Sequence, residues 1–199
     1  MAEQGEAFFE SRRFEQLSNT IFGVAMTLLA YGFPRDQFAS GAPDWHSIAR
    51  EYLPHFIAMI LGFVVAGMFW FSHQRRLAYA PKMSRAEVLT TLLLLLSIIL
   101  LPATTGLYGA YWQAADIILL YACHLAVIAL LNFALWWMAV APRRDWHHIG
   151  APAVAAAIFV LTAVAAAYAP YVARYAWSLA FIAPAIAAFV ERRAQRRRS

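Results

Sequence analysis

Several long apolar blocks, each near the length of a membrane-spanning helix, follow one another along this sequence and are separated by short loops. The hydrocarbon core of a bilayer is about 30 Å thick, and a helix of about 20 predominantly apolar residues crosses it. Backbone groups inside lipid must be hydrogen-bonded within the spanning segment, so such blocks predict α-helices. Only 14% of the residues are charged, against about 25% in an ordinary soluble domain. The sequence therefore predicts an all-α integral membrane protein.

We predict six transmembrane helices in one domain that covers residues 1–199, with a polar tail at residues 1–10 and a basic tail at residues 191–199. The predicted spans lie at about residues 14–33, 52–71, 88–107, 117–140, 150–168 and 173–190. Pro102 is expected to kink the third helix, with Thr104 and Thr105 satisfying the freed backbone groups.

The positive charges are unevenly distributed between the two sides of the predicted helices. All Lys and Arg residues fall on the side of the two tails except Arg35, Arg50 and Arg174. Lys and Arg near the ends of spans mark the cytoplasmic side, so both termini are expected in the cytoplasm. The net charge of +5 comes from residues that lie between apolar blocks, which argues against a nucleic-acid partner and for the lipid bilayer.

The first predicted helix differs from the others because its opening turns are polar. From Ile21 to Phe33 it is apolar or small apart from Thr27. An apolar run of roughly 10–14 residues more often belongs to a buried helix than to a lipid-facing span. Polar groups at membrane depth need protein or water beside them. We therefore expect this helix to face the interior of a bundle, or water.

One stripe of this helix is a candidate pore surface. Val24, Leu28 and Tyr31 are spaced i, i+4 and i+7, and Leu17 and Arg13 continue the stripe toward the cytoplasmic end. Thr27 lies on a neighbouring face. An ordinary packing stripe has the same spacing, so the residues alone leave both interpretations open.

A second candidate cluster joins the first two helices. Arg13, Ser18 and Asn19 should lie at the same membrane level as Trp70 and His73, which share a face of the second helix. An Arg guanidinium can stack on Trp, and Ser, Asn and His can exchange hydrogen bonds. Interfacial anchoring and snorkelling are the alternative interpretation of Trp and Arg here.

Other polar residues are weaker candidates. Asp145, His147 and His148 resemble a metal-binding group in a loop, and interhelical hydrogen bonding is the favoured role for His124 and Asn132. No nucleotide-binding loop, zinc-helix motif or serine elbow is present, so we expect no cofactor and no enzyme.

The string Arg13-Phe14-Glu15-Gln16-Leu17-Ser18-Asn19 resembles the R-x-x-x-F-S-D signature that opens the first helix of the endosomal/lysosomal potassium channel family (transmembrane protein 175), in its prokaryotic branch. Trp70-Phe71-Ser72-His73 resembles the Trp and His of that family's second helix. Two positions depart from the signature: Leu17 replaces Phe, and Asn19 replaces Asp and so loses the negative charge.

The resemblance implies a homotetramer in a prokaryotic cell membrane, with four copies of the first helix around a pore for monovalent cations. Potassium is the implied permeant ion. Carried onto this chain, the constriction is expected at Val24, Leu28 and Tyr31, narrowest at Leu28, with Thr27 beside the pore. The implied bracing residues are Arg13, Leu17, Ser18, Asn19, Trp70 and His73.

The chain has no TVGYG filter, so we expect modest cation selectivity and a gate that closes by dewetting, with proton permeation if a water wire forms. A secondary transporter of a small ion or solute, with a site near the polar residues of the fourth helix, is the alternative. The sequence shows no clear internal repeat or paired broken helices, which such transporters often have.

Overall fold

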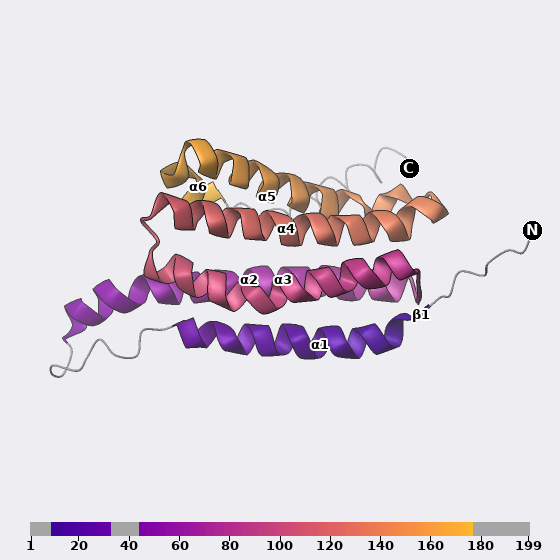
Figure 1. Ribbon diagram of the computed structural model, residues 1–199, viewed down its shortest axis with the longest axis horizontal. Coiled ribbons are helices and arrows are strands. Elements are labelled where there is room, and N and C mark those ends of the chain that lie inside the picture. The colour runs from indigo at the N-terminus through magenta and orange to yellow at the C-terminus, as the bar shows by residue number, and fades with distance from the viewer. Residues whose placement is uncertain (1–8, 33–43, 177–199) are drawn as a thin grey trace, which may run out of the picture.

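The helices of this protein run side by side along one axis (Figure 1). A computed structural model describes residues 9–32 and 44–176. The elements are β1 (Phe9–Glu10), α1 (Ser11–Leu28), the 3-10 turn η1 (Leu29–Gly32), α2 (Trp45–Tyr79), β2 (Lys82–Met83), α3 (Arg85–Ala110), α4 (Ala115–Val140), η2 (Ala141–Arg143), η3 (Trp146–His148), α5 (Gly150–Tyr168) and α6 (Pro170–Ala176). The helix α1 packs on α2 and α3, whereas α4 packs between α3 and α5.

Four helices in the described ranges are long and apolar enough to cross a membrane, and they support an integral membrane protein. These are the segments Ile48–Tyr79, Arg85–Ala110, Ala115–Arg143 and Gly150–Tyr168. The helix α1 falls outside this set because its 18 residues include Arg12, Arg13 and Glu15. The predicted loop after the first helix, most of the predicted sixth helix and the basic tail lie outside the described residues.

Two boundaries differ from the sequence prediction. The second helix begins at Trp45 and continues to Tyr79, beyond the predicted residues 52–71. Pro54 lies inside it, in the third turn, where a proline has no N–H to donate to the carbonyl oxygen of Arg50. The last two residues of the predicted polar tail form a strand, because Phe9 and Glu10 pair antiparallel with Met83 and Lys82. The described chain is therefore mostly helical, with one two-residue ribbon.

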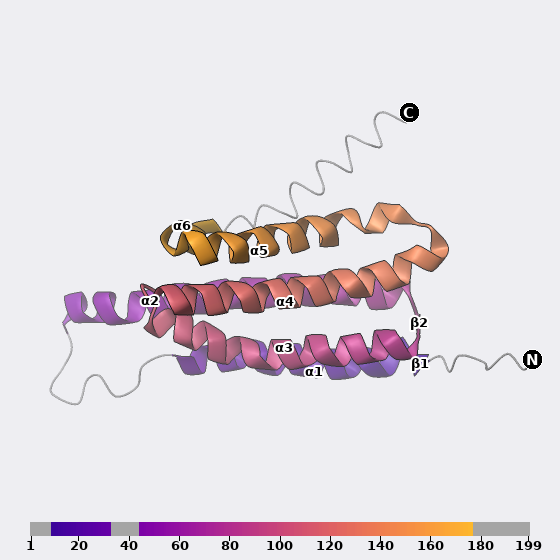
Figure 2. The ribbon, with the colours of Figure 1, turned by 45° about the horizontal axis from the view of Figure 1, so that its top comes forward.

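The third helix is continuous through Pro102, and Figure 2 shows its C-terminal end bending toward α4. The hydroxyl of Thr104 lies 3.1 Å from the carbonyl oxygen of Leu101 and donates to Nδ1 of His124 at 2.8 Å. Nε2 of His124 donates to the carbonyl oxygen of Ser97 at 3.0 Å. The backbone around the proline is thus supported from α4, rather than by Thr104 and Thr105 alone.

The core lies between α2, α3, α4 and α5 and is built from aliphatic and aromatic side chains. The outer faces of α2 and α3 are also apolar, and their large exposed side chains include Leu53, Phe56, Ile57, Ile60, Phe63, Val64, Phe71, Leu89, Leu92, Leu93, Leu96, Ile99 and Leu100. An apolar surface of this extent would mark an interface in a soluble protein. On these membrane-length helices it suits contact with lipid or with another copy.

Candidate functional site on the first helix

The helix α1 has a buried face and an open face. Ser18, Phe22, Ala25 and Leu29 are buried, and their spacing of four, three and four residues defines the face that packs on α2 and α3. Leu29 is only 3% exposed, because it lies in the contact between η1, α2 and α3. This face anchors the helix to the rest of its own chain.

The open face carries the residues that the sequence proposed for the pore. Val24 is 51% exposed, Leu28 40% and Tyr31 66%. Leu17 and Thr27 are exposed on the same side, and the hydroxyl of Thr27 donates to the carbonyl oxygen of Val24 at 2.7 Å. In the single chain, then, a stripe of large apolar side chains on α1 is left uncovered.

The helix type changes at the C-terminal end of this stripe. The α-helix ends at Leu28, and Leu29–Gly32 forms the 3-10 turn η1. Side chains three residues apart eclipse one another in a 3-10 helix, whereas in an α-helix they are offset by about 60°. The turn therefore brings Tyr31 closer to alignment with Leu28 than a continuing α-helix would.

The polar entrance of α1 is fastened to α2 by hydrogen bonds. Oγ of Ser18 and Nε2 of His73 are 3.0 Å apart, and both side chains are fully buried. Oδ1 of Asn19 accepts from Nε1 of Trp70 at 2.8 Å and from Nε2 of Gln74. The amide oxygen of Asn19 thus receives two donors without a negative charge. The sequence analysis missed Gln74, which lies one turn after Trp70 on the same face of α2.

Two of the proposed bracing residues are not brought into this cluster. Arg13 and Leu17 are exposed on α1. Within residues 9–32 and 44–176, Arg13 has no hydrogen bond or ion pair, and Trp70 instead donates to Asn19. A bracing role for Arg13 and Leu17 within one chain has no contact to support it, and a role toward another copy stays a prediction.

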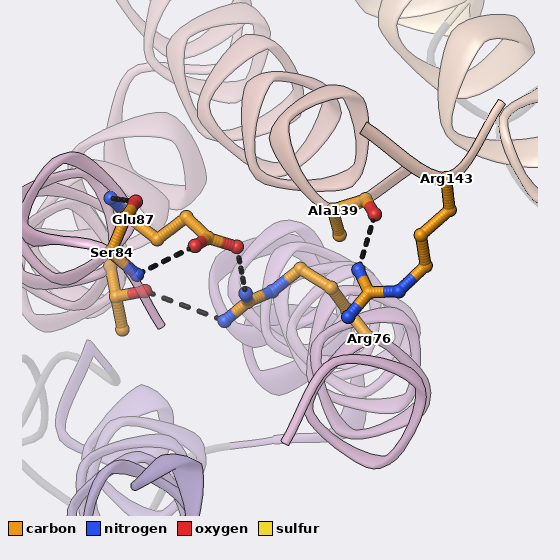
Figure 3. A network of polar contacts seen from close by, with 6 residues as sticks. Arg76, Ser84, Glu87, Ala139 and Arg143 are labelled. Atoms are coloured by element: carbon orange, nitrogen blue, oxygen red, sulfur yellow. Dashed lines mark hydrogen bonds and ion pairs between the residues drawn. The ribbon is translucent and has the colours of Figure 1, made fainter. Parts of the chain in front are cut away.

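A buried charge beside this cluster was not found by sequence reasoning. Arg76 is one of the basic residues beside the predicted spans, but its side chain is 0% exposed. Its Nη1 lies 3.7 Å from Oε1 of Glu87, and its Nη2 donates to Oγ1 of Thr91 at 3.5 Å (Figure 3). The available signal was the capping box of Ser84 and Glu87, which places this carboxylate at the start of α3, close to the end of α2.

Comparison with known proteins finds a match to the part of the chain that contains the proposed signature. Residues 13–102 match the family described as endosomal/lysosomal potassium channel TMEM175. The match begins at the Arg of the proposed signature and covers α1, α2 and most of α3. The first half of the chain is therefore similar to the TMEM175 family. This match confirms the resemblance inferred from the first two helices, and the matched family is one of channels, not of enzymes.

Two individual relatives extend the comparison. A potassium channel of Streptomyces collinus is 27% identical over 135 residues, which make up 64% of this chain and 64% of that protein. The crystal structure of a lysosomal potassium-selective channel TMEM175 homologue from Chamaesiphon minutus superposes with a TM-score of 0.74 and 18% identity, covering 89% of this chain and 97% of that one. At this identity the likeness shows a shared fold.

The weaker polar candidates serve as links between elements of this chain. Asn132 and Trp136 of α4 both donate to Oγ of Ser72, at 3.1 and 3.0 Å. Asp145 lies 3.4 Å from Nε2 of His148 and accepts from the hydroxyl of Tyr79 at 3.2 Å. In the described part of the chain no group of three or more metal-ligating side chains forms.

Replacing Ser18 with alanine should lower the free energy of unfolding by about 1–3 kcal/mol, because Nε2 of His73 would stay buried without its partner. The measurement is thermal or denaturant unfolding of the purified protein in detergent. Thr20 is the matched control, since its exposed hydroxyl donates only to the carbonyl oxygen of Gln16 in the same helix. Equal stability losses in Ser18→Ala and Thr20→Ala would contradict the bracing role of Ser18.

Proposed function

We propose that this chain forms a potassium-permeable cation channel that conducts passively, with the open face of α1 lining the pore in a homotetramer. The observation that carries the proposal is the division of α1 into a buried anchoring face and an uncovered stripe of Val24, Leu28 and Tyr31. A membrane helix with Arg13 and Thr27 on its open side suits a water-lined axis better than lipid. The match of residues 13–102 to a potassium channel family and the likeness to a potassium channel support potassium as the permeant ion.

The proposed gate is a ring of four Leu28 side chains. Apolar constrictions stop ions by excluding water, since an ion that enters must lose hydration without compensation. In this arrangement the ring would open by small rotations of α1, and selectivity among monovalent cations would be set by the width of the pore and by Thr27. Protons would pass whenever a continuous water wire forms.

In the proposed orientation, the end of the bundle that carries the β1–β2 pair lies in the cytoplasm of a prokaryotic cell. The start of α1, the end of α2 and the start of α3 all lie at this end (Figure 1). It carries Arg75, Lys82, Arg85, Arg143 and Arg144. Basic residues beside spans favour the cytoplasmic side, which supports this placement for both termini.

The deciding experiment for conduction is single-channel recording of the purified protein in planar bilayers. We expect unitary cation currents whose reversal potential follows the potassium gradient. A slow, saturable and coupled uptake into liposomes, without unitary currents, would replace the channel by the secondary transporter. The proposed channel does not require His124 or Asn132, the polar residues of α4. Asn132→Ala should therefore leave the reversal potential unchanged.

The homotetramer is tested by native mass spectrometry in mild detergent and in nanodiscs. We expect the mass of four chains, because the uncovered stripe of α1 needs partners on a closed axis. Only monomers or dimers in both environments would refute the tetrameric pore.

A further inference from the structure

The turn between α2 and α3 holds the start of α1. Phe9 and Glu10 pair with Met83 and Lys82, and the backbone N–H of Ser11 donates to the carbonyl oxygen of Pro81 at 3.0 Å. Met83 is fully buried, so this turn is a packed part of the bundle rather than an exposed loop. The first residue of α1 is thus fixed by backbone hydrogen bonds to residues 81–83.

A second attachment holds α1 two turns later. Ser18 and Asn19 bond to His73, Trp70 and Gln74 of α2. The helix α1 therefore has one attachment on the turn and one on α2. Its tilt and rotation depend on how the turn sits relative to the last turns of α2.

The Arg76–Glu87 pair sets that relation. Arg76 lies one turn after His73 on α2, and Glu87 belongs to the first turn of α3. Oε2 of Glu87 accepts from the backbone N–H of Ser84 at 2.8 Å, while its Oε1 faces Arg76 (Figure 3). The carboxylate of Glu87 therefore binds both the end of the turn, through Ser84, and the end of α2, through Arg76.

Within the described residues Nε and Nη1 of Arg76 make no hydrogen bond, although the side chain is buried. A buried charge is costly unless an opposite charge compensates it, and removing one partner of such a pair is strongly destabilising. The attraction to Glu87 is thus the main compensation for burying Arg76. Replacing both charged groups together should cost far less than replacing one.

We propose that Arg76 and Glu87 are a positioning pair for the pore helix: their ion pair fixes the turn at residues 80–84 against α2 and so fixes the orientation of α1. The role in conduction rests on the proposed function, since it requires α1 to line the pore. The pair does not touch the permeant ion, and it acts through the two attachments of α1.

The first test is hydrogen–deuterium exchange of the purified protein, which does not depend on conduction. In Glu87→Gln, backbone amides of residues 9–18 should exchange about tenfold faster or more, whereas those of α5 should change little, because only the attachments of α1 are loosened. The double variant R76M/E87Q removes both charges and keeps an acceptor for the N–H of Ser84. It should regain the thermal stability of the original protein, while residues 9–18 still exchange fast.

The matched control is Arg143→Met, which removes a neighbouring Arg of η2. Its Nη1 donates to the carbonyl oxygen of Ala139 at 2.7 Å, and its guanidinium lies over the ring of Tyr79. Within the described residues it forms no hydrogen bond or ion pair with the turn at residues 80–84. This variant should not change exchange in residues 9–18. Equal acceleration in α5 and in residues 9–18 of Glu87→Gln, or original protection in the double variant, would show that the pair only stabilises the fold and would overturn the proposal.

The second test is the potassium-to-sodium permeability ratio from reversal potentials in bilayers. In R76M/E87Q this ratio should change by about fivefold, the lower range of couplings between separate sites, while Arg143→Met keeps the original ratio. An unchanged ratio in a conducting double variant with fast exchange at residues 9–18 would refute the effect on the pore. If the unaltered protein carries no current, the proposed function fails, and the exchange experiment alone decides whether the pair positions α1.

Discussion

Replacing Leu28 with serine should raise the cation current through the reconstituted channel by about tenfold. The side chain is 40% exposed on the open face of α1, where four copies would meet at the axis. A serine ring keeps water in the constriction, so a passing ion loses less of its hydration. A barrier lower by about 1.4 kcal/mol corresponds to the expected tenfold change. Discrimination among monovalent cations should fall at the same time, which bi-ionic reversal potentials would measure.

The neighbouring residue supplies the control for this experiment. Leu29 is 3% exposed and packs against α2 and α3, so Leu29→Ser should lower the free energy of unfolding by about 2–5 kcal/mol, as truncation of a buried leucine does. Its effect on unitary current should be small in the protein that still assembles. A larger current in Leu29→Ser together with an unchanged current in Leu28→Ser would move the pore face by one residue.

Replacing Gly62 with valine should disrupt the packing of Leu29, the residue that directly follows α1, against α2. A methyl group on Gly62 would lie 3.0 Å from Cδ2 of Leu29 and from both Oγ1 and Cγ2 of Thr105. These contacts are too close, so Leu29 and Thr105 would have to move apart. Overpacking of this kind costs about 1–3 kcal/mol. We expect lower thermal stability and, because Leu29 adjoins the proposed gate residue Leu28, an altered open probability.

Gly67 is the matched control on the same helix. A methyl group there would meet only Cε of Met26, at 4.0 Å, so Gly67→Val should keep stability within about 1 kcal/mol of the original protein, as helix propensity alone predicts. Unfolding temperatures in detergent and open probabilities in bilayers measure both effects. Similar losses in the two variants would mean that valine in α2, rather than the contact with Leu29, causes the change.

The sequence by itself was sufficient for the four membrane-length helices of the described residues and for the polar start of α1. Apolar length depends only on local composition, so α5 was predicted with the bounds that the structure has. The polar start of α1 and the spacing of Val24, Leu28 and Tyr31 are likewise local, since helical periodicity places them on one face. Even the shared level of Ser18 and His73 followed from counting residues inward from one membrane surface.

Only the tertiary structure decided which polar groups are buried and paired. Arg76 has the same local sequence signal as exposed Arg75, and its burial depends on α3 bringing Glu87 and Thr91 beside it. The ribbon of Phe9 and Glu10 likewise depends on a partner strand more than 70 residues away in the sequence. Leu28 and Leu29 differ in exposure because η1 packs on α2 and α3 through one side only. Periodicity defines the faces of a helix, but the contacts that cover one face and leave the other open arise from distant segments, and no local pattern encodes them.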